Sequence, residues 1–256
     1  MSSLALGRDY VLSLERGLEV IQSFGRDAER MTLSEVARRT GLSRAASRRF
    51  LLTLTELGYV AFDGKRFSLT PRVLGLGYAY LASHTVVEVA QPILERVSER
   101  LHESCSLSVL DGAEIVYVAR APTKRIMSVT ISIGTRLPAH ATSMGQVLLA
   151  ALAQEKLDAY LAATERKPYT PHTVTDEAQL RVLLARVAQQ GYSLVDQELE
   201  AGLRSIAVPV RDRAGRVIAA MNVSSHAARA SLGDMVKALL PPLRRAAADL
   251  TASLPN

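Results

Sequence analysis

Three stretches in the second half of the sequence carry side chains that could hold a small organic anion. They are GTRLPAHATSMG (134–145), DQELEAGLRSIAVPV (196–210) and NVSS (222–225). The first leads into the start of a helix, whose free backbone N–H groups favour a carboxylate. In the third, Asn222 and Ser224 lie two residues apart and therefore share one face of a strand. Hydroxyls, an amide, a carboxylate and arginines among apolar strands suit a ligand that carries both a carboxylate and hydroxyl groups.

The middle stretch holds most of the charge in this set, and it allows two interpretations. Arg204 and Ser205 follow an acidic, glycine-containing loop that includes Asp196 and Glu198. Charge favours Arg204, together with Arg136 of the first stretch, as a partner for a bound carboxylate. Alternatively, the acidic residues and Arg204 form a purely structural ion pair, and the sequence does not decide between the two.

The sequence lacks the motifs that would indicate an enzyme. It contains no Gly-x-Ser-x-Gly, no P-loop, no dinucleotide-binding fingerprint and no His-Glu-x-x-His. Its five histidines are scattered, and its one cysteine, Cys105, is better explained as a core thiol than as a nucleophile. A lone cysteine also excludes an internal disulfide and a Cys-rich zinc site. We therefore expect no catalysis, no metal and no cofactor.

The composition predicts a soluble protein of the reducing cytoplasm. At 256 residues the chain can hold a small domain and a larger one. No apolar run approaches the roughly 20 residues that span a bilayer. The N-terminus, MSSLALGRDYVLSLERG, has neither the basic start nor the apolar stretch of a secretory signal.

Positive charge is concentrated in the N-terminal part of a chain whose net charge is +6. Residues 1–75 hold 12 Lys and Arg against 8 Asp and Glu, and residues 30–50 hold six arginines against one acid, Glu35. A basic patch in a small segment is the electrostatic footprint of a nucleic-acid binder. The same run could be only a solvated surface, which is the commoner case.

The elements that would position these charges begin with two helices. Apolar residues recur at helical spacing over 10–24, and Gly25 ends that helix. Thr32 and Glu35 form a capping-box pattern at the start of a short second helix, which ends in a tight turn at Gly41.

The third helix is expected to be charged at its start and apolar along its shaft. Ser43 can cap it, and Gly58 breaks it. On a helical wheel Arg44 and Arg48 lie roughly opposite the residues expected to face the core, which are Ala46, Phe50, Leu54 and Leu57. The charged start can therefore reach the major groove of DNA while the shaft packs against the other helices.

A basic hairpin completes the N-terminal pattern. The strand-like runs 59–62 and 66–69 flank the turn signal Asp63-Gly64. Helix, helix, turn, helix and hairpin predict a winged helix-turn-helix, and the alternative is a three-helix bundle with a hairpin lid. The residues predicted to contact double-stranded DNA are Thr32, Ser43, Arg44, Ser47, Arg48, Arg49, Lys65 and Arg66.

The segment 69–104 reads as mostly helical, and its first half carries an apolar surface that is broad for a connector. Such a surface indicates packing against a partner subunit or domain, and two DNA-binding units would enlarge a limited footprint. We therefore expect a homodimer or tetramer. The predicted boundaries are 1–72 for the DNA-binding domain, 73–90 for a linker helix used in dimerisation, and 91–256 for the effector domain.

Strand patterns dominate from Cys105 onward. Runs within 105–120 flank Asp111-Gly112, and a third run covers 125–134. Further strands are expected in 192–198, 204–212 and 216–225, with helices starting at Thr142 or Ser143, over 176–190, and over 232–254 with an interruption at Pro241-Pro242. Antiparallel strands with helices at the ends predict an α+β fold.

The whole chain resembles the IclR family of bacterial transcriptional regulators, from about Tyr10 to about Leu250. The resemblance is carried by TLSEVARRTGLSRAASRRFLLTLTELGYV, RLPAHATSMGQVLLA and DQELEAGLRSIAVPVRD. TPRVLGLGYAYL, DGAEIVYVAR and RIMSVTISIGTRLPA are similar to the β-ketoadipate-pathway branch of that family, which contains PcaR, PcaU and PobR.

The resemblance implies an N-terminal winged helix-turn-helix, a linker helix used in dimerisation, a C-terminal GAF-like α/β effector domain, and dimers that can pair into tetramers. It also implies a small aromatic or dicarboxylic acid as effector, because the branch responds to hydroxybenzoates, protocatechuate or β-ketoadipate. Matched residue by residue, the effector pocket falls on Ser143, Met144, Asp196, Glu198, Ser205, Asn222 and Ser224. Arg136 and Arg204 join this set only on the strength of their charge.

The leading hypothesis is thus a ligand-responsive transcriptional regulator of aromatic-acid catabolism, whose DNA-binding and effector units lie in separate domains. Two alternatives remain. One is a small-molecule enzyme with a regulatory DNA-binding domain, and the other is a DNA binder that needs no effector.

Overall fold

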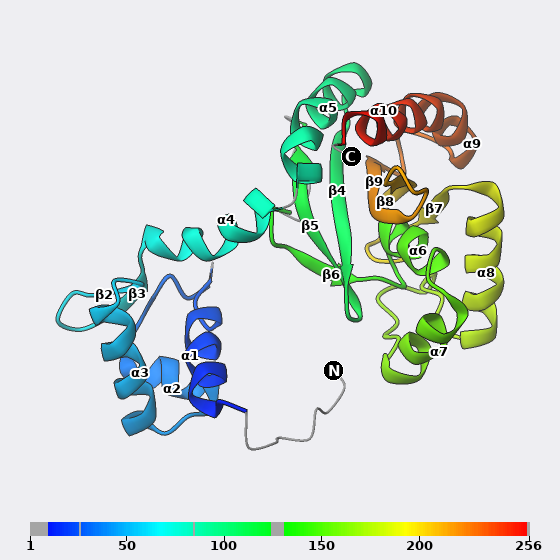
Figure 1. Cartoon of the computed structure of the whole chain (residues 1–256). Coiled ribbons are helices and arrows are strands. Elements are labelled where there is room, and N and C mark those ends of the chain that lie inside the picture. Colours follow the sequence, from blue (N-terminus) through cyan, green and yellow to red (C-terminus); the bar gives the residue numbers. More distant parts are fainter. Residues whose placement is uncertain (1–9, 26, 84, 124–130, 255–256) are drawn as a thin grey trace. The chain divides into compact units, whose positions relative to one another are not determined.

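The computed structural model describes residues 10–25, 27–83, 85–123 and 131–254 of the chain. The chain divides into two compact units between Ser83 and His84, and each is described by itself (Figure 1). The predicted linker, 73–90, covers helix α4 (Leu74–Ser83) and the first turns of helix α5 (Thr85–Leu101).

The N-terminal unit is the predicted winged helix-turn-helix. Its helices are α1 (Leu12–Gln22), α2 (Leu33–Thr40) and α3 (Arg44–Glu56), and a short 3-10 turn, Pro71–Val73, leads into α4. Strands β2 (Val60–Phe62) and β3 (Phe67–Leu69) form the hairpin. Strand β1 (Arg30–Met31), which the sequence pattern did not predict, completes an antiparallel sheet of order β1-β3-β2.

Local sequence signals set the ends of α2 and α3 as predicted. The Thr32 hydroxyl accepts the Glu35 backbone N–H while the Glu35 carboxylate accepts the Thr32 N–H, which is a complete capping box. Gly41 ends α2 with a φ of 68°, in the left-handed region that favours glycine. Ser43 caps α3 by accepting the Ala46 N–H at 3.2 Å.

The predicted inner face of α3 is right at Leu54, but the buried face is rotated about the helix axis away from the other predicted positions. The buried residues are Ser47, Leu51 and Leu54. The two leucines pack in one cluster with Val20 of α1 and Val36 of α2. Phe50 is only half-buried and Leu57 is 51% exposed. The helix carries apolar residues on two adjacent faces, so its own sequence does not say which face meets α1 and α2.

The C-terminal unit is an α+β fold on one antiparallel six-stranded sheet of order β6-β5-β4-β9-β8-β7 (Figure 1). Its strands are β4 (Ser104–Asp111), β5 (Glu114–Ala121), β6 (Arg136–Pro138), β7 (Ser193–Asp196), β8 (Leu203–Arg211) and β9 (Val217–His226). Besides α5, its helices are α6 (Ser143–Ala150), α7 (Gln154–Ala163), α8 (Glu177–Gln190), α9 (Leu232–Asp234) and α10 (Leu240–Ser253).

Several predicted elements of this unit need correction. Most of the strand expected at 125–134 lies outside the described residues, and 131–134 form no strand. Strand β6 lies instead in the segment expected to be a loop, and α7 was not predicted. The proline pair does not interrupt the last helix, because the two prolines occupy the first turn of α10. A π-helical turn, Met235–Leu239, directly precedes α10. The first turn tolerates proline, since its N–H groups have no partner within the helix.

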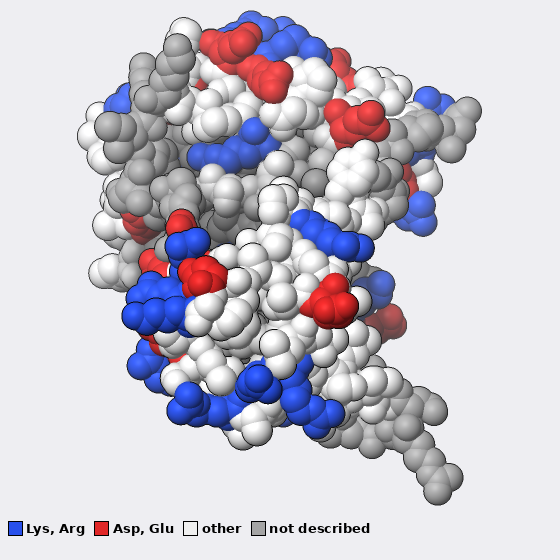
Figure 2. Space-filling model, turned by 90° about the vertical axis from the view of Figure 1, so that its left-hand side faces the viewer, with Lys and Arg blue, Asp and Glu red and all other residues white. Residues whose placement is uncertain are grey.

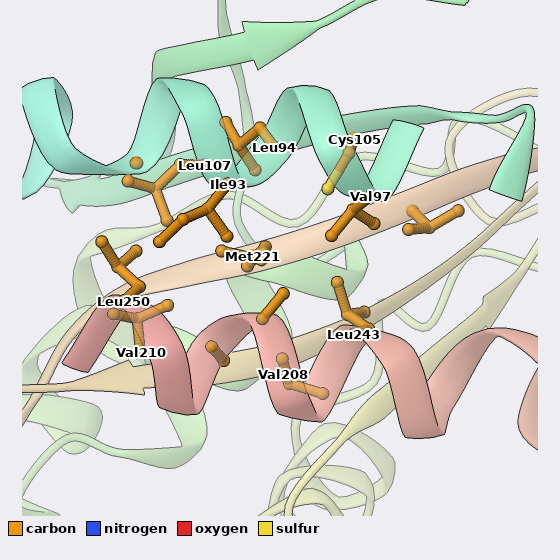
Figure 3. Packing of buried hydrophobic residues seen from close by; sticks show 14 of the residues in the cluster. Ile93, Leu94, Val97, Cys105, Leu107, Val208, Val210, Met221, Leu243 and Leu250 are labelled. Atoms are coloured by element: carbon orange, nitrogen blue, oxygen red, sulfur yellow. The ribbon is translucent and has the colours of Figure 1, made fainter. Parts of the chain in front are cut away.

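The two faces of the six-stranded sheet pack against different helices. Helices α5 and α10 cover one face, and Leu94, Met221 and Leu243 are among the fully buried residues of that core (Figure 3). On the other face α6 and α8 bury a second cluster that includes Met144 and Leu184. The alternation of side chains along each strand separates the two clusters.

Candidate functional site

The first candidate surface lies on α3 and the β2–β3 hairpin. Arg44, Arg48 and Arg49 on α3 and Lys65 and Arg66 on the hairpin are all exposed. Within the described part of the chain, none of the five lies in an ion pair. Their charge is therefore available to phosphate oxygens. Figure 2 shows Lys and Arg side chains in blue, several of them gathered in the lower part of the view.

The three hydroxyl residues predicted to contact DNA differ in where they lie. Ser43 is exposed and Thr32 is half-buried, and both side chains cap helices. Ser47 is 0% exposed, and its Oγ has no hydrogen-bond partner among the described residues. Ser47 lies one helical turn before Leu51, so it packs in the core of the unit instead of at its surface.

The second candidate site is a cavity in the C-terminal unit, between the sheet and the start of α6. Its empty space, open mouth included, is about 640 Å³. Its apolar walls are Tyr117, Ile131, Leu137, Met144, Val195, Leu199 and Leu203. Its polar lining includes Ser104, Arg120, Ser143, Glu200, Ser205, Asn222 and Ser224. An apolar slot with a few polar groups suits a small ligand with a ring and polar substituents.

Strand register builds the polar floor of this cavity. Ser106 on β4 pairs with Arg120 on β5 and with Asn222 on β9, so these three residues form one row across the sheet. Ser224 on β9 pairs with Ser104 on β4 and with Ser205 on β8, which forms a second row two residues away. Residues two apart share a face, so both rows lie under α6.

A hydrogen-bond network joins the floor to α6. The Ser143 and Ser205 hydroxyl oxygens lie 2.7 Å apart. The Asn222 amide donates from Nδ2 to Ser205 Oγ at 2.9 Å and to Ser224 Oγ at 3.1 Å. The other side of that amide, Asn222 Oδ1, is buried and has no partner among the described residues. Among the described residues the network therefore retains an unused acceptor on a residue that lines the cavity.

A β-bulge brings Tyr117 and Arg120 to the same side of the sheet. Leu107 pairs with Ala119 and Ser108 pairs with Tyr117, so Val118 has no partner on β4. In a regular strand, residues three apart face opposite sides, but the extra residue re-aims one of them. Both side chains consequently line the cavity, although their spacing in the sequence argues against it.

Arg120 is the arginine of the cavity. Its Nη1 donates to Ser106 Oγ at 3.3 Å, and no acidic partner lies within ion-pair distance in the described ranges. Burial lowers the pKa of Arg120 from its ordinary value, because the charged form loses hydration. Burial also raises the pKa of Tyr117 to about 12, so the phenol beside it stays neutral. A half-buried guanidinium without a carboxylate is suited to receive one from a ligand.

The two arginines proposed from charge have partners elsewhere. Arg136 Nη1 lies 2.8 Å from Asp111, its Nε lies 2.7 Å from Glu114, and its side chain is 44% exposed. Arg204 Nε lies 2.6 Å from Asp196, so the structural ion pair named as the alternative is the one present. Neither arginine lines the cavity, and the hydrogen-bonded Arg204 guanidinium lowers the pKa of Asp196.

Glu198 is held in a buried polar cluster beneath α6. Gln146 Nε2 donates to its carboxylate at 3.0 Å and to the His140 carbonyl at 3.1 Å, and Ser193 donates to Gln146 at 2.6 Å. Burial raises the pKa of Glu198 to about 7, because the charged form is disfavoured away from water. Glu198 therefore fastens the loop 197–202, whereas its neighbours Leu199 and Glu200 line the cavity.

The structure thus brings five of the nine predicted effector residues to one cavity, namely Ser143, Met144, Ser205, Asn222 and Ser224. It adds Arg120, Tyr117, Ser104 and Glu200, which the sequence pattern missed. The alternation of serine in SCSLS (104–108) was an available signal for a polar strand face. For Arg120 no such signal existed, because its direction depends on the bulge.

Other kinds of site find no support in the described ranges. No helix there is long and apolar enough to cross a membrane, and no three His, Cys, Asp or Glu residues gather as metal ligands. Cys105 is fully buried, and burial strongly raises the pKa of its thiol. A buried neutral thiol is unsuited to nucleophilic attack.

The fold and the two sites define a class of protein, in which a winged helix-turn-helix is joined to a unit with an apolar cavity that has a polar floor. Comparison with known proteins gives the family. Residues 13–64 match the IclR helix-turn-helix domain, and residues 78–252 match the family described as bacterial transcriptional regulator IclR C-terminal. The chain belongs to the IclR family and is a DNA-binding transcriptional regulator, not a member of an enzyme family.

Three relatives are informative. The Pca regulon regulatory protein of Pseudomonas putida is 45% identical over 96% of this chain and 85% of that protein. The p-hydroxybenzoate hydroxylase transcriptional activator of Acinetobacter baylyi is 40% identical over 94% of this chain and 91% of that protein. The crystal structure of an IclR homolog complexed with 4-hydroxybenzoate, from Microbacterium hydrocarbonoxydans, is 29% identical with a TM-score of 0.82, covering 94% of this chain and 98% of that one.

Proposed function

We propose that this regulator controls genes of aromatic-acid catabolism and that its effector is a small organic acid bound in the cavity under α6. The observation that carries the proposal is Arg120, a half-buried guanidinium without an acidic partner among the described residues, in the wall of an apolar slot. The names of the relatives point the same way, since they concern the Pca regulon and p-hydroxybenzoate.

The proposed binding mode follows from the chemistry of the lining. Arg120 pairs with the effector carboxylate, and the apolar walls contact the ring. A polar substituent forms hydrogen bonds with Ser143, Ser205, Asn222 and Ser224. Met144 contributes to the apolar wall, and its sulfur accepts the Ser108 hydroxyl at 3.2 Å. Asp196, Glu198 and Arg204 act indirectly by holding the loop that bears Leu199 and Glu200.

Double-stranded operator DNA is the proposed target of the N-terminal unit. In this proposal the start of α3 enters the major groove with Arg44, Arg48 and Arg49, and the hairpin places Lys65 and Arg66 on the backbone. Thr32 and Ser43 stand at helix starts, where backbone N–H groups favour phosphate. An organic-acid sensor of this kind would work in the cytoplasm.

A homodimer, which can pair into a tetramer, is the proposed assembly. An apolar groove between α1 and α3 supports it, because Leu14, Leu18, Leu57 and Leu76 line that groove and are each at least 45% exposed. Uncovered leucines of this kind mark surfaces that bury themselves against a partner.

Calorimetric titration with 4-hydroxybenzoate, followed by DNA-binding assays on the chain's own upstream DNA, tests the proposal. Arg120→Gln should weaken effector binding at least tenfold and leave DNA binding without effector unchanged. Arg186→Gln on the exposed face of α8 is the matched control and should change neither. Equal effector affinity in the Arg120 variant and the wild type would remove the proposed binding mode. The regulatory role itself would fail if no aromatic acid altered retention of the upstream DNA.

A further inference from the structure

We infer that the cavity selects acids with a single carboxylate and a hydroxyl group, and that Glu200 and Asn222 exclude dicarboxylates. This inference rests on the proposed effector site and narrows it, because the sequence left aromatic and dicarboxylic acids equally open. Both residues line the cavity, and each has its own chemistry.

The first observation is the charge of the cavity wall. In the part of the chain that the structure describes, the charged residues lining the cavity are Arg120 and Glu200. Glu200 is half-buried, and no ion pair or side-chain hydrogen bond among the described residues engages its carboxylate. One ligand carboxylate balances Arg120, whereas a second one meets an uncompensated like charge in a site partly shielded from water.

The second observation is the orientation of the Asn222 amide. Asn222 uses its Nδ2 protons on Ser205 and Ser224, and its Oδ1 stays buried without a partner among the described residues. A ligand hydroxyl can donate a proton to Oδ1 and accept one from a neighbouring serine. An ionised carboxylate only accepts, so it places oxygen lone pairs against the Asn222 oxygen and leaves that acceptor unsatisfied.

The third observation is the distance between the two recognition points. Arg120, Ser106 and Asn222 occupy one row on three adjacent strands. Neighbouring strands lie about 4.8 Å apart, so the backbones at Arg120 and Asn222 are separated by about 10 Å. Arg120 reaches towards Ser106 in the middle of the row, so the two side chains can meet different parts of one small ligand. The carboxylate end belongs at Arg120 and the substituent end at Asn222.

Benzoate, 4-hydroxybenzoate and terephthalate provide a matched ligand series, since they differ only in the group opposite the carboxylate. Calorimetric titration of the full chain should rank 4-hydroxybenzoate above benzoate and benzoate above terephthalate. Glu200→Gln should strengthen terephthalate binding about tenfold while changing 4-hydroxybenzoate binding less than about threefold. Glu155→Gln, on the exposed start of α7, is the control and should leave all three affinities unchanged.

Asn222→Leu should abolish the preference for 4-hydroxybenzoate over benzoate, because the acceptor for the hydroxyl is gone. Circular dichroism checks its fold, and Glu200→Gln supplies the decisive result if that variant does not fold. Wild-type protein that binds terephthalate as tightly as 4-hydroxybenzoate, or a Glu200→Gln variant with unchanged ratios, overturns the selectivity and leaves the aromatic-acid response standing. Absence of binding by all three acids overturns both proposals.

Discussion

The two faces of the six-stranded sheet are made from the same strands and have opposite chemistry. On the side of α5 and α10, Cys105, Leu107 and Met221 join a dry apolar core (Figure 3). On the side of α6, the neighbouring residues Ser106 and Asn222 belong to a polar floor. The contrast shows a division of roles, in which the apolar face fixes the strand register and the polar face uses that register to assemble a site.

The division has a consequence for substitutions. A change on the apolar face removes buried contacts and is expected to lower stability without touching the ligand. A change on the polar face disturbs a network that is partly satisfied by neighbouring hydroxyls, so its effect is expected mainly on effector affinity. Variants on the two faces therefore separate the energetics of folding from those of binding.

The largest effect is expected on the apolar face, at Leu243. Its side chain is fully buried on α10, so Leu243→Ala should lower the free energy of unfolding by about 2–5 kcal/mol through lost contacts and a cavity. Urea denaturation followed by circular dichroism measures the loss. Val182→Ala, on α8 and 72% exposed, is the control and should change the stability by less than about 0.5 kcal/mol. Equal losses at both positions would contradict the assigned core.

A second large effect is expected at Gly145 on α6, directly after the cavity-lining residues Ser143 and Met144. A Cβ added there would lie 2.1 Å from the Ala139 carbonyl oxygen, so Gly145→Ala must displace either α6 or the segment before it. We expect a loss of about 3 kcal/mol in unfolding free energy together with weaker effector binding. At Gly77 of α4 a Cβ meets nothing within 4 Å, so Gly77→Ala should be neutral or stabilising. A stable Gly145→Ala variant with normal binding would show that the start of α6 is not held closely.

The sequence predicted the parts of the molecule that depend on neighbouring residues. The capping box of Thr32 and Glu35, the turn at Gly41 and the hairpin at Asp63-Gly64 all rest on contacts within four residues. The serine and asparagine positions of the cavity came from the residue pattern together with the family resemblance, Met144 came from the resemblance alone, and those five line it. Local patterns and a long family motif are therefore sufficient to outline both units.

The remaining features depend on contacts that no local pattern contains. Arg120 faces the cavity only because Val118 bulges out of the pairing with β4. Arg136 and Arg204 look equally suitable in the sequence, but each meets an acid from another segment or strand. Ser47 looks like a surface residue on a basic helix, yet tertiary packing chooses its face of α3 for the core. Strand register and helix rotation are long-range properties, so composition and spacing do not determine them.

An intermediate effect, which depends on pH, is expected at Glu198 on the polar side. Its pKa in the folded protein is raised to about 7 from an ordinary value of 4.5, so the folded state holds the proton more tightly than the unfolded chain does. The stability from this group is complete below pH 4.5 and is lost as the pH rises to about 7, by on the order of 3 kcal/mol.

Glu198→Gln tests this, because the amide is neutral at every pH. Between pH 4.5 and pH 7.5 the wild type should lose on the order of 3 kcal/mol more unfolding free energy than the variant does. Urea denaturation at both pH values measures the difference. Asp158→Asn, an exposed carboxylate on α7, should keep the wild-type slope. If the unfolding free energies of the wild type and Glu198→Gln changed with pH in the same way, Glu198 would be ionised in its cluster.

The smallest effect on stability is expected at Ser205. Its neighbour on β8, Ile206, faces the other side of the sheet, so substitutions at these two positions compare the two faces directly. Ser205→Ala removes a hydroxyl shared with Ser143, Asn222 and Ser224, but the amide keeps its bond to Ser224. The unfolding free energy should fall by about 1 kcal/mol or less, while affinity for 4-hydroxybenzoate falls severalfold. Ile206→Val should cost a similar amount of stability, about 0.5–1.5 kcal/mol, and leave the affinity unchanged. If calorimetric titration found the same affinity loss in both variants, the two faces would be coupled, and the sheet could not be treated as a scaffold with independent sides.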